Sequence, residues 1–486
     1  MADIYADQDA LSRKEQQESL YADRVKVYPK KIEGPVRRLK WAVVAVLLSI
    51  YYLAPWLRWD RGPAAPDQAF LIDMPNRRAY ILWIEIWPQE LYFLVGLLLL
   101  GALGMFFVTS LFGRIWCGYT CPQTVWTDLF MWVERLIEGD RNQRMRLDKA
   151  STSPTKVWKK TAKHSAWMVM ALLTGGAWIM YFNDAQTVVP AIFTGEAGLQ
   201  VYFFLGLFTA TTYLLAGWAR EQVCIYMCPW PRFQSAMFDE DTLIVTYREW
   251  RGEPRGKHKK GESWDNRGDC VDCRHCVAVC PTGIDIRDGV QLECIGCGLC
   301  MDACNKIMTN LDLPKGLIGY DSPGNQELRA AGKQPHTHFV RPRTVVYAVV
   351  FSLISALMLW GLLSRTTVEV NVLHDRNPVF VTLSDNSVRN GYTIRVLNKT
   401  REDKIYKLSF DGLGYATMSV VGQEDSASQN VARITSVADS VTTYRVFITE
   451  PPELADFSQK AFDFVLTDQA TGEIARHETV LRGPGS

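Results

Sequence analysis

The sequence lacks an excess of either charge, since its 486 residues hold 53 Lys+Arg against 52 Asp+Glu, a net charge of +1. This balance gives no reason to expect nucleic acid as a partner. No G-x-G-x-x-G motif follows a predicted strand, so nothing supports a bound flavin or nicotinamide. Of seven histidines, only His164 lies at a long apolar segment, where an interface residue is expected. A membrane haem of the b type needs axial side chains inside the helix bundle, so none is expected.

Charged residues are also missing from five long apolar segments, at residues 41–57, 91–112, 167–182, 199–218 and 344–363. A membrane helix needs about 20 mostly apolar residues, so five transmembrane helices are predicted. A polar tail of about 40 residues precedes the first segment and is too long for the n-region of a cleaved signal peptide. The first helix is therefore expected to remain as an anchor.

Basic residues flank these segments unevenly. Residues 21–40 hold seven Lys and Arg and residues 113–163 hold ten, whereas residues 183–198 hold none. Because basic residues stay on the cytoplasmic side, the N-terminus is predicted to be cytoplasmic, and five crossings place the C-terminal segment outside. Arg58, Arg61, Arg77 and Arg78, between the first two segments, do not fit this orientation.

The predicted organisation is a multi-domain membrane protein: a five-helix transmembrane bundle, an α+β two-cluster ferredoxin domain and a C-terminal all-β immunoglobulin-like sandwich. In chain order these parts are a cytoplasmic tail at 1–40, four membrane helices at 41–220 with a first C-x3-C-P motif at 117–122, a second such motif and linker at 221–262, a cytoplasmic ferredoxin-like domain at 263–342, a fifth membrane helix at 343–364 and a periplasmic β-sandwich at 365–486.

The sandwich is predicted from period-2 alternation. The alternating apolar positions are Val368, Val370 and Val372; Tyr392, Ile394 and Val396; Tyr406, Leu408 and Phe410; Tyr444, Val446 and Ile448; and Phe462, Phe464 and Leu466. Turns are expected at Asn390-Gly391, Asp411-Gly412 and Thr471-Gly472. This part contains no cysteine, and a stabilising or docking role is expected for it.

Eight of the 12 cysteines form two consecutive C-x2-C-x2-C-x3-C runs. This is the spacing with which bacterial ferredoxins bind two [4Fe-4S] clusters, and the fourth cysteine of each run serves the other cluster. The predicted ligands are Cys270, Cys273, Cys276 and Cys304 for a first cluster, and Cys294, Cys297, Cys300 and Cys280 for a second. The first run ends in Pro281, whereas the second is followed by Asn305.

Two other readings of these cysteines are less favoured. A zinc site needs only four ligands and does not explain three close cysteines with a distant fourth, twice. Disulfides are not expected on the cytoplasmic side. His275 lies inside the first run and is expected to face solvent, because four thiolates are available to each cluster.

The remaining four cysteines form a repeat, Cys117-Gly-Tyr-Thr-Cys121-Pro122 and Cys224-Ile-Tyr-Met-Cys228-Pro229, in which each copy follows an apolar segment. A composite four-thiol site at one membrane face is expected. Cys121 should lie at a helix N-terminus, where the dipole lowers a thiol pKa, and Arg114 and Arg220 should add positive charge. Thiolates select soft metals such as Cu(I), and Met227 offers a thioether.

Spacing alone does not choose among three uses for these four thiols: a structural pair of buried thiols, a further iron–sulfur or zinc site, or thiol-based copper or disulfide redox chemistry. We favour the last, since iron–sulfur clusters transfer single electrons and copper would provide an acceptor on the same face. The electrons must then come from a partner protein or from quinol.

The two C-x3-C-P motifs, the double ferredoxin run, the segment GRIWCGYTCPQTVWTDLF and the C-terminal DRNPVFVTLSDNSVRNGYT together resemble the CcoG family of cytochrome c oxidase accessory proteins, also called FixG or RdxA. The resemblance covers nearly the whole chain after its first 20 residues. It implies a multi-pass protein of the bacterial inner membrane that reduces Cu(II) to Cu(I) during maturation of a cbb-type oxidase, with Cys117, Cys121, Cys224 and Cys228 handling copper.

The implied partners are membrane lipid, cbb-type oxidase subunits or a copper chaperone, and an electron donor that the sequence does not identify. Two other functions remain open. One is a quinol-linked membrane ferredoxin that feeds a periplasmic reductase. The other is a non-redox scaffold for oxidase assembly, which the eight predicted cluster ligands argue against as a sole role.

Overall fold

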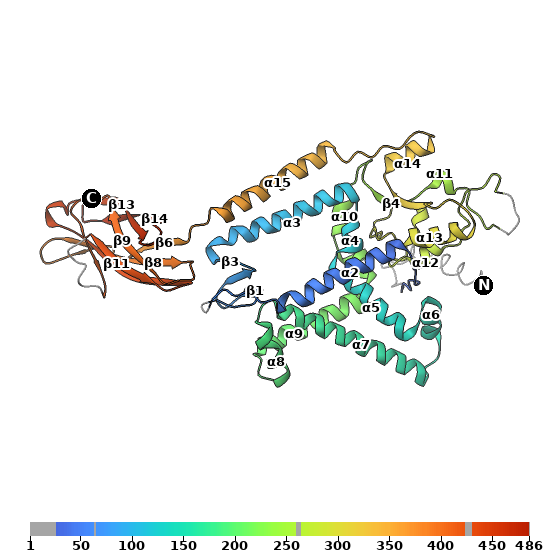
Figure 1. Cartoon of the computed structure of the whole chain (residues 1–486), viewed down its shortest axis with the longest axis horizontal. Coiled ribbons are helices and arrows are strands. Elements are labelled where there is room, and N and C mark those ends of the chain that lie inside the picture. The colour runs from blue at the N-terminus through green and yellow to red at the C-terminus, as the bar shows by residue number, and fades with distance from the viewer. Residues whose placement is uncertain (1–25, 63–64, 259–263, 423–429, 486) are drawn as a thin grey trace. The chain divides into compact units, whose positions relative to one another are not determined.

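The computed structural model describes residues 26–62, 65–258, 264–422 and 430–485 (Figure 1). The chain divides into two compact units. The first comprises the chain up to Leu57 together with Phe70–Ile81 and Glu85–Ala356. The second comprises Arg58–Ala69, Leu82–Ile84 and the chain from Leu357 onward.

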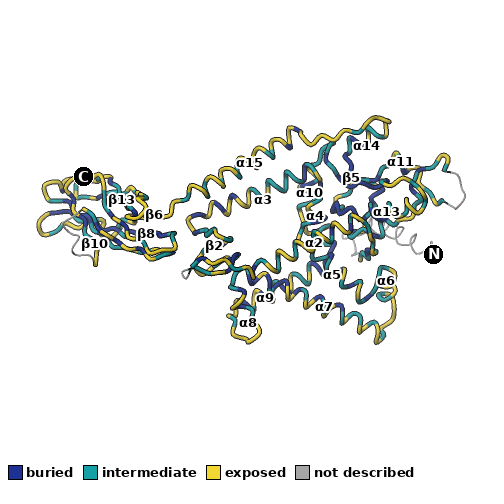
Figure 2. Tube along the Cα trace, viewed as in Figure 1, coloured by how far each residue is buried: buried dark blue, intermediate teal, exposed yellow. Residues whose placement is uncertain are grey.

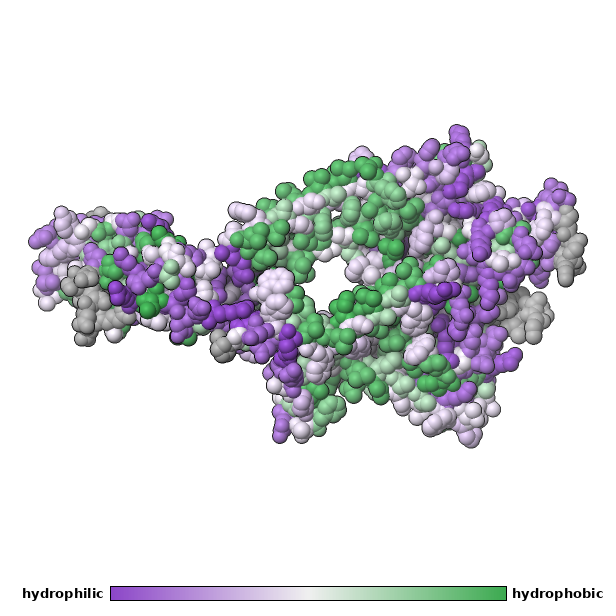
Figure 3. All heavy atoms as spheres, viewed as in Figure 1, coloured by the Kyte–Doolittle hydropathy of each residue, from purple (hydrophilic) through white to green (hydrophobic). Residues whose placement is uncertain are grey.

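Four helical segments of the described residues are long and apolar enough to cross a membrane: Pro35–Trp56, Pro88–Phe112, Leu199–Ala219 and Pro342–Leu363. They contain α2 (Pro35–Leu53), α3 (Leu91–Phe112), α9 (Leu199–Thr212) with the π-helical Tyr213–Ala219, and α15 (Pro342–Leu363). The most apolar stretch of α15 has no buried residue, and α15 is exposed along most of its length (Figure 2). Hydrophobic side chains gather over α3 and α15 in Figure 3, as lipid-facing helices require.

The predicted count of five such helices is one too many. Residues 167–179 of the segment at 167–182 lie in α7 (Pro154–Ile179), which is long enough but not apolar enough to be counted with the other four. Lysines occupy the first turns of α7, at Lys156, Lys159, Lys160 and Lys163. The charge-free remainder is therefore shorter than a full crossing.

Helix α7 nevertheless packs along α9, and α8 (Ala185–Thr194) joins the two. A Cβ on Gly175 would lie 2.9 Å from Thr209 Oγ1, so the missing side chain permits close helix contact. Farther along, a Cβ on Gly217 would lie 3.1 Å from the Trp167 ring. The two helices thus form a hairpin, which returns the chain after α9 to the level of Trp167 in α7.

Short elements surround the cysteines in the first unit. They are α4 (Ile115–Tyr119), α5 (Pro122–Glu138), α6 (Arg141–Lys149), α10 (Trp230–Ser235), α11 (Glu249–Gly252), α12 (His275–Val279), α13 (Leu299–Asn310) and α14 (Pro323–Ala330), with strands β4 (Ile244–Tyr247) and β5 (Ile318–Asp321). The antiparallel β4–β5 pair packs with the cysteine loops in one apolar core that includes Cys270, Cys276 and Met308. This is the predicted α+β ferredoxin domain.

The segment between α2 and α3 contains a small sheet that the sequence analysis did not predict, with β1 (Phe70–Asp73), β2 (Arg78–Ile81) and β3 (Ile84–Ile86). This segment contains the four arginines that do not fit the predicted orientation, and two of them have partners within it. The Arg61 side chain is buried and donates to backbone carbonyls of its own loop, including Gln68 O at 2.8 Å. Arg78 pairs with Glu85 at 2.9 Å.

The second unit contains the predicted sandwich. One sheet has the order β10-β12-β8-β6, with β7 also paired to β8, and the other has the order β11-β9-β13-β14. The strands are β6 (Val368–His374), β7 (Val381–Thr382), β8 (Val388–Asn398), β9 (Lys404–Asp411), β10 (Thr417–Val420), β11 (Val431–Ser436), β12 (Ser440–Glu450), β13 (Gln459–Asp468) and β14 (Ile474–Arg482). The predicted alternating positions face the core, which confirms the inward register of five strands.

One predicted turn is wrong. Asn390 and Gly391 lie inside β8, because the Asn390 side chain is fully buried and forms hydrogen bonds that hold it there. It accepts from the Arg482 N–H at 2.9 Å and donates to the Arg482 carbonyl at 2.8 Å. The other two signals end strands, with positive φ at Gly412 (101°) and Gly472 (73°).

Candidate redox site

Each predicted quartet of cysteines lines a cavity of its own. The first cavity is lined by Cys270, Cys273, Cys276 and Cys304. The second is lined by Cys280, Cys294, Cys297 and Cys300, with Cys276 also at its wall. The structure therefore brings Cys304 to the first run and Cys280 to the second, as the crossed ligand pattern requires. The ligand assignment stays a prediction, and this grouping supports it.

Two short helices place these sulfurs. Helix α12 begins directly after Arg274, whose φ is 53°, and carries Cys276 in its first turn. Helix α13 begins after Gly298, whose φ is +71°, and carries Cys300 and Cys304. Residues four apart share one helix face, so α13 presents one sulfur to each cavity. The residues fit two four-thiol groups.

Burial controls the charge of these thiols. It raises the pKa of Cys294 and Cys304 to about 12, and the neighbouring cysteines add to the rise. Burial also raises the pKa of Cys276 to about 12. Neutral thiols do not bind iron, whereas a coordinating cation deprotonates them. The cavities are thus suited to a group that brings its own positive charge.

The two C-x3-C-P motifs converge at one place. Cys117 lies in α4 and Cys224 in the π-helical turn Val223–Met227, and both pack against the same apolar cluster, which includes Cys297. Burial, followed by the charge of the neighbouring motif thiols, raises the pKa of Cys117 and Cys224 to about 12. Cys121 caps the N-terminus of α5 as predicted.

Within the described part of the chain, no three His, Cys, Asp or Glu side chains converge as a single-ion site does. The four motif thiols lie near one another without forming such a centre, and their use as copper ligands stays a prediction. Cys228 is exposed, whereas Cys117, Cys121 and Cys224 are half-buried. A metal ion would therefore reach the Cys228 sulfur first.

The first motif lies directly on the loop of the second quartet. A Cβ on Gly118 would come within 2.9 Å of the Cys297 Cα and 3.0 Å of the Ile295 carbonyl oxygen, so only glycine allows this approach. Arg114 donates to the carbonyls of Gln291 at 3.1 Å and Cys294 at 2.9 Å. These contacts join the motif to the second cavity without an intervening layer of side chains.

Two buried residues at this junction were missed by the sequence analysis. The Cys117 thiol donates to Gln234 Oε1 at 3.2 Å, and Gln234 is fully buried. Lys40 is 1% exposed and pairs with Asp128 at 3.0 Å. Burial raises the pKa of Cys224 and Cys297, and the charge of Lys40 offsets part of that rise in both. Gln234 has no motif around it, and Lys40 was counted only as a basic flank.

Four other residues considered from the sequence have the following surroundings. Arg220 pairs with Glu134 at 3.0 Å instead of supplying free charge to the thiols. Cys228 is followed by α10, which has only six residues and is capped by Pro229. The Met227 side chain is exposed. His164 forms a hydrogen bond to the Tyr213 hydroxyl at 2.8 Å.

Three family models match the chain. A 4Fe-4S dicluster domain matches residues 219–323, which contain the eight ferredoxin-type cysteines and the second motif. A 4Fe-4S binding domain matches residues 94–139, which contain the first motif. The immunoglobulin-like fold at the C-terminus of FixG matches residues 358–484. With the apolar helices and paired cavities, these matches define a membrane iron–sulfur oxidoreductase with two [4Fe-4S] clusters.

Relatives of known name cover nearly the whole chain. Nitrogen fixation protein FixG of Rhizobium meliloti (strain 1021) is 47% identical over 96% of this chain and 94% of its own length. Protein RdxB of Cereibacter sphaeroides is 46% identical over 97% and 99%, and protein RdxA of the same organism is 48% identical over 89% and 91%. The chain belongs to the FixG family, which confirms the resemblance drawn from its motifs.

Proposed function

We propose that this protein reduces Cu(II) to Cu(I) at the C-x3-C-P thiols and supplies Cu(I) for maturation of a cbb-type cytochrome c oxidase. The observation that carries the proposal is the direct contact of the first motif with the loop of the second quartet at Gly118 and Cys297. Electron transfer from the second cluster site to a metal at the motif then needs no further carrier.

The protein's own residues divide the work. When bound, the two [4Fe-4S] clusters store and transfer single electrons. The exposed Cys228 receives the Cu(II) substrate, and the half-buried Cys117, Cys121 and Cys224 shield the ion from water. One electron converts Cu(II) to Cu(I), and the softer ion is the one that thiolates prefer. No other bond forms or breaks in this step.

The proposal is tested by changing all four motif cysteines to Ala in the full-length protein. We expect iron content to stay at about eight atoms per chain, for two clusters, while copper binding and Cu(II) reduction after chemical reduction are lost. EPR of the reduced protein, with and without Cu(II), reports the clusters and the copper oxidation state together. Unaltered Cu(II) reduction in the variant would falsify the role of the thiols.

A second candidate has one specific observation in its favour, the match of a 4Fe-4S binding domain to residues 94–139. This segment has only Cys117 and Cys121, so a cluster there would need Cys224 and Cys228 as well. The protein would then be a quinol-linked electron carrier with a third cluster. It predicts about 12 iron atoms per chain and cluster reduction by quinol that added copper does not change.

The proposed setting is a bacterial inner membrane, with the N-terminus and ferredoxin domain cytoplasmic and the β-sandwich periplasmic. This orientation needs five crossings, so it requires α7 to cross the membrane packed along α9, in addition to the four helices that are apolar enough by themselves. The uneven distribution of Lys and Arg around the apolar segments supports this orientation. The arginines between α2 and α3 count less against it, because Arg61 is buried and Arg78 is paired with Glu85. The proposed partners are membrane lipid, cbb-type oxidase subunits or a copper chaperone, and an electron donor. Cysteine accessibility to a membrane-impermeant reagent, measured from each side at positions introduced in the tail and sandwich, tests the orientation.

A further inference from the structure

A cavity of about 610 Å³ lies beside the first cysteine quartet and has no role in the function proposed above. It is formed by three parts of the first unit that are far apart in sequence. Lys30 comes from the segment before α2, Arg141 from the start of α6, and Lys257 from the segment after α11. The loop that carries Cys273, Arg274 and His275 completes it.

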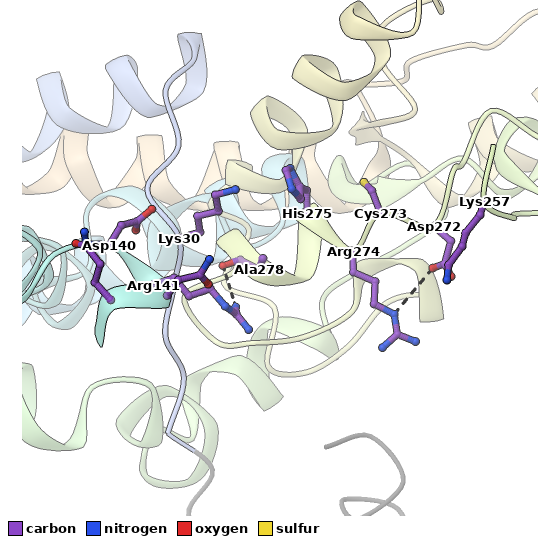
Figure 4. Close-up of a pocket in the computed structure, with 11 residues that line it drawn as sticks. Lys30, Asp140, Arg141, Lys257, Asp272, Cys273, Arg274, His275 and Ala278 are labelled. Carbon is purple, nitrogen blue, oxygen red and sulfur yellow. Dashed lines mark hydrogen bonds and ion pairs between the residues drawn. The ribbon is translucent and has the colours of Figure 1, made fainter. Parts of the chain in front are cut away.

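The charge around this cavity is mainly positive. Figure 4 shows Lys30 and Arg141 on one side and Lys257, Arg274 and Asp272 on the other. The two carboxylates of the lining are already engaged. Asp272 is paired with Arg287 at 2.5 Å, and Asp140 caps α6 and accepts from the Lys31 N–H at 2.9 Å. Within the described residues, the ammonium groups of Lys30 and Lys257 form no ion pair.

The cavity also shares a wall with the first cluster site. Cys273, Arg274 and His275 line both cavities. Cys273 is the exposed member of its quartet, whereas Cys270 and Cys276 are buried and Cys304 is half-buried. A molecule in the basic cavity would therefore lie against the most accessible sulfur of the first quartet.

We propose that this basic cavity is the docking site of the electron donor, and that the donor is an acidic one-electron carrier protein whose carboxylates enter the cavity. Complementary charge steers such partners and raises their association rate. A [4Fe-4S] cluster accepts single electrons, which a one-electron carrier supplies directly. Each encounter oxidises the carrier by one electron and reduces this protein by one, and no bond is made or broken.

The inference rests on the proposed function for the destination of the electrons, but its test is separate. The main variant is Lys30→Glu/Lys257→Glu in the full-length protein with its clusters loaded, and the control is Lys333→Glu, an exposed lysine outside the cavity. The probe is a bacterial flavodoxin, which is acidic and transfers one electron from its hydroquinone. Iron content is measured first, to show that the variants keep both clusters.

Binding of oxidised flavodoxin, which involves no electron transfer, is measured by thermophoresis at low and high salt. We expect the double variant to bind at least about tenfold more weakly at low salt, with a flatter salt dependence. The rate of reduction by flavodoxin hydroquinone should fall by a similar factor. Reduction by methyl viologen radical, a small cationic donor, should be as fast or faster in the double variant, because the added negative charge attracts it. In the control, flavodoxin binding and the rate of reduction by flavodoxin hydroquinone should both stay unchanged.

Equal flavodoxin binding by the double variant and the wild type overturns the docking site. Displacement of flavodoxin by millimolar inorganic phosphate, but not by chloride at equal ionic strength, would identify a small-anion site and also overturns it. If flavodoxin docking depends on the cavity charges but methyl viologen-reduced wild type does not reduce Cu(II), the docking site stands and the proposed function fails. If methyl viologen-reduced wild type and double variant both reduce Cu(II), and flavodoxin binds the two proteins equally, the proposed function stands and the docking site fails.

Discussion

Gly118 of the first C-x3-C-P motif lies against the backbone of Cys297 in the second ferredoxin run, so closely that a Cβ on Gly118 would stand 2.9 Å from the Cys297 Cα. The two residues are far apart in sequence, and they belong to two different cysteine motifs. Their contact makes the motif and the second cluster loop one structural element, and a change on either side should affect both.

Gly118→Ala is therefore expected to displace the second cluster loop. The three nearest atoms, Cys297 Cα, Cys297 N and the Ile295 carbonyl oxygen, are all backbone and cannot move aside as a flexible side chain can. Overpacking of this kind costs about 1–3 kcal/mol. We expect the iron content to fall from about eight toward about four atoms per chain, together with slower Cu(II) reduction. Gly206→Ala is the matched control, because nothing lies within 4 Å of a Cβ there. Full iron content in Gly118→Ala would contradict the contact.

Arg114→Lys should weaken the second cluster site selectively. The guanidinium of Arg114 reaches several carbonyls of the loop at once, including Gln291 and Cys294, and an ammonium group cannot reproduce this fork. Loss of hydrogen bonds from a charged group costs about 1.5–3 kcal/mol. In EPR of the reduced protein we expect one cluster signal to decrease while the other remains. Arg146→Lys on α6, an exposed position, should leave both signals, and equal loss of both signals in Arg114→Lys would argue against a local role.

Lys40→Met should make the second cluster harder to reduce. Lys40 is buried and its charge acts on Cys297. Reduction adds negative charge, which a nearby cation stabilises, so removing the cation should lower the midpoint potential, by up to about 60 mV if the equilibrium changes tenfold. Redox titration followed by EPR measures the shift. Arg38→Met removes an exposed cation from the same helix and should not shift the potential; a rise in Lys40→Met would contradict the prediction.

The sandwich should lose stability in acid through Asp468. Burial alone would raise the pKa of Asp468, but hydrogen bonds from Lys404, the Ala470 N–H and Thr471 bring this pKa down to about 2. A carboxyl group has a pKa of about 3.9 in an unfolded chain. The stabilisation is therefore present above about pH 4 and is lost as the pH falls from there through about 2.

Hydrogen exchange of β9 and β13 amides in the full-length protein, corrected for the intrinsic rate at each pH, measures this loss. In Asp468→Asn the protection should be lower at pH 6 and should change less between pH 4 and pH 2. Asp456→Asn, at an exposed aspartate of the same unit, should behave like the wild type. If the protection of these amides in Asp468→Asn still falls steeply between pH 4 and pH 2, the loss of stability is due to other groups.

Local sequence signals predicted much of this protein for physical reasons. Cysteine spacing predicts a loop that binds a cluster, because three of the four ligands come from one short turn. The structure groups Cys304 with the cysteines of the first run and Cys280 with those of the second, in agreement with the crossed pattern. Alternation predicted five strands, because one face of each strand is buried in the sandwich. The Asn390-Gly391 turn failed because a buried side chain can find partners inside a strand, which no dipeptide signal reports.

The junction between the motifs and the second cluster loop was beyond sequence reasoning. Gly118 and Gln234 have no distinctive neighbours, and their importance comes only from packing between segments distant in the chain. The apolar run in α7 led to one membrane helix too many in the predicted count. Lysines shorten the charge-free part of α7, and the helix is stabilised by packing against α9. The raised pKa of Cys117 and Cys224 likewise follows from burial that sequence position does not reveal.

Helix α13 has a consequence for how the protein is assembled. Cys300 and Cys304 are one turn apart, so the helix rise places their backbone attachments about 6 Å apart along one axis. Inserting iron at either site orders the helix that carries a ligand for the other. We therefore expect the loading of one site to speed the loading of the other in the wild type, while a chain damaged at one site still holds the cluster at the other.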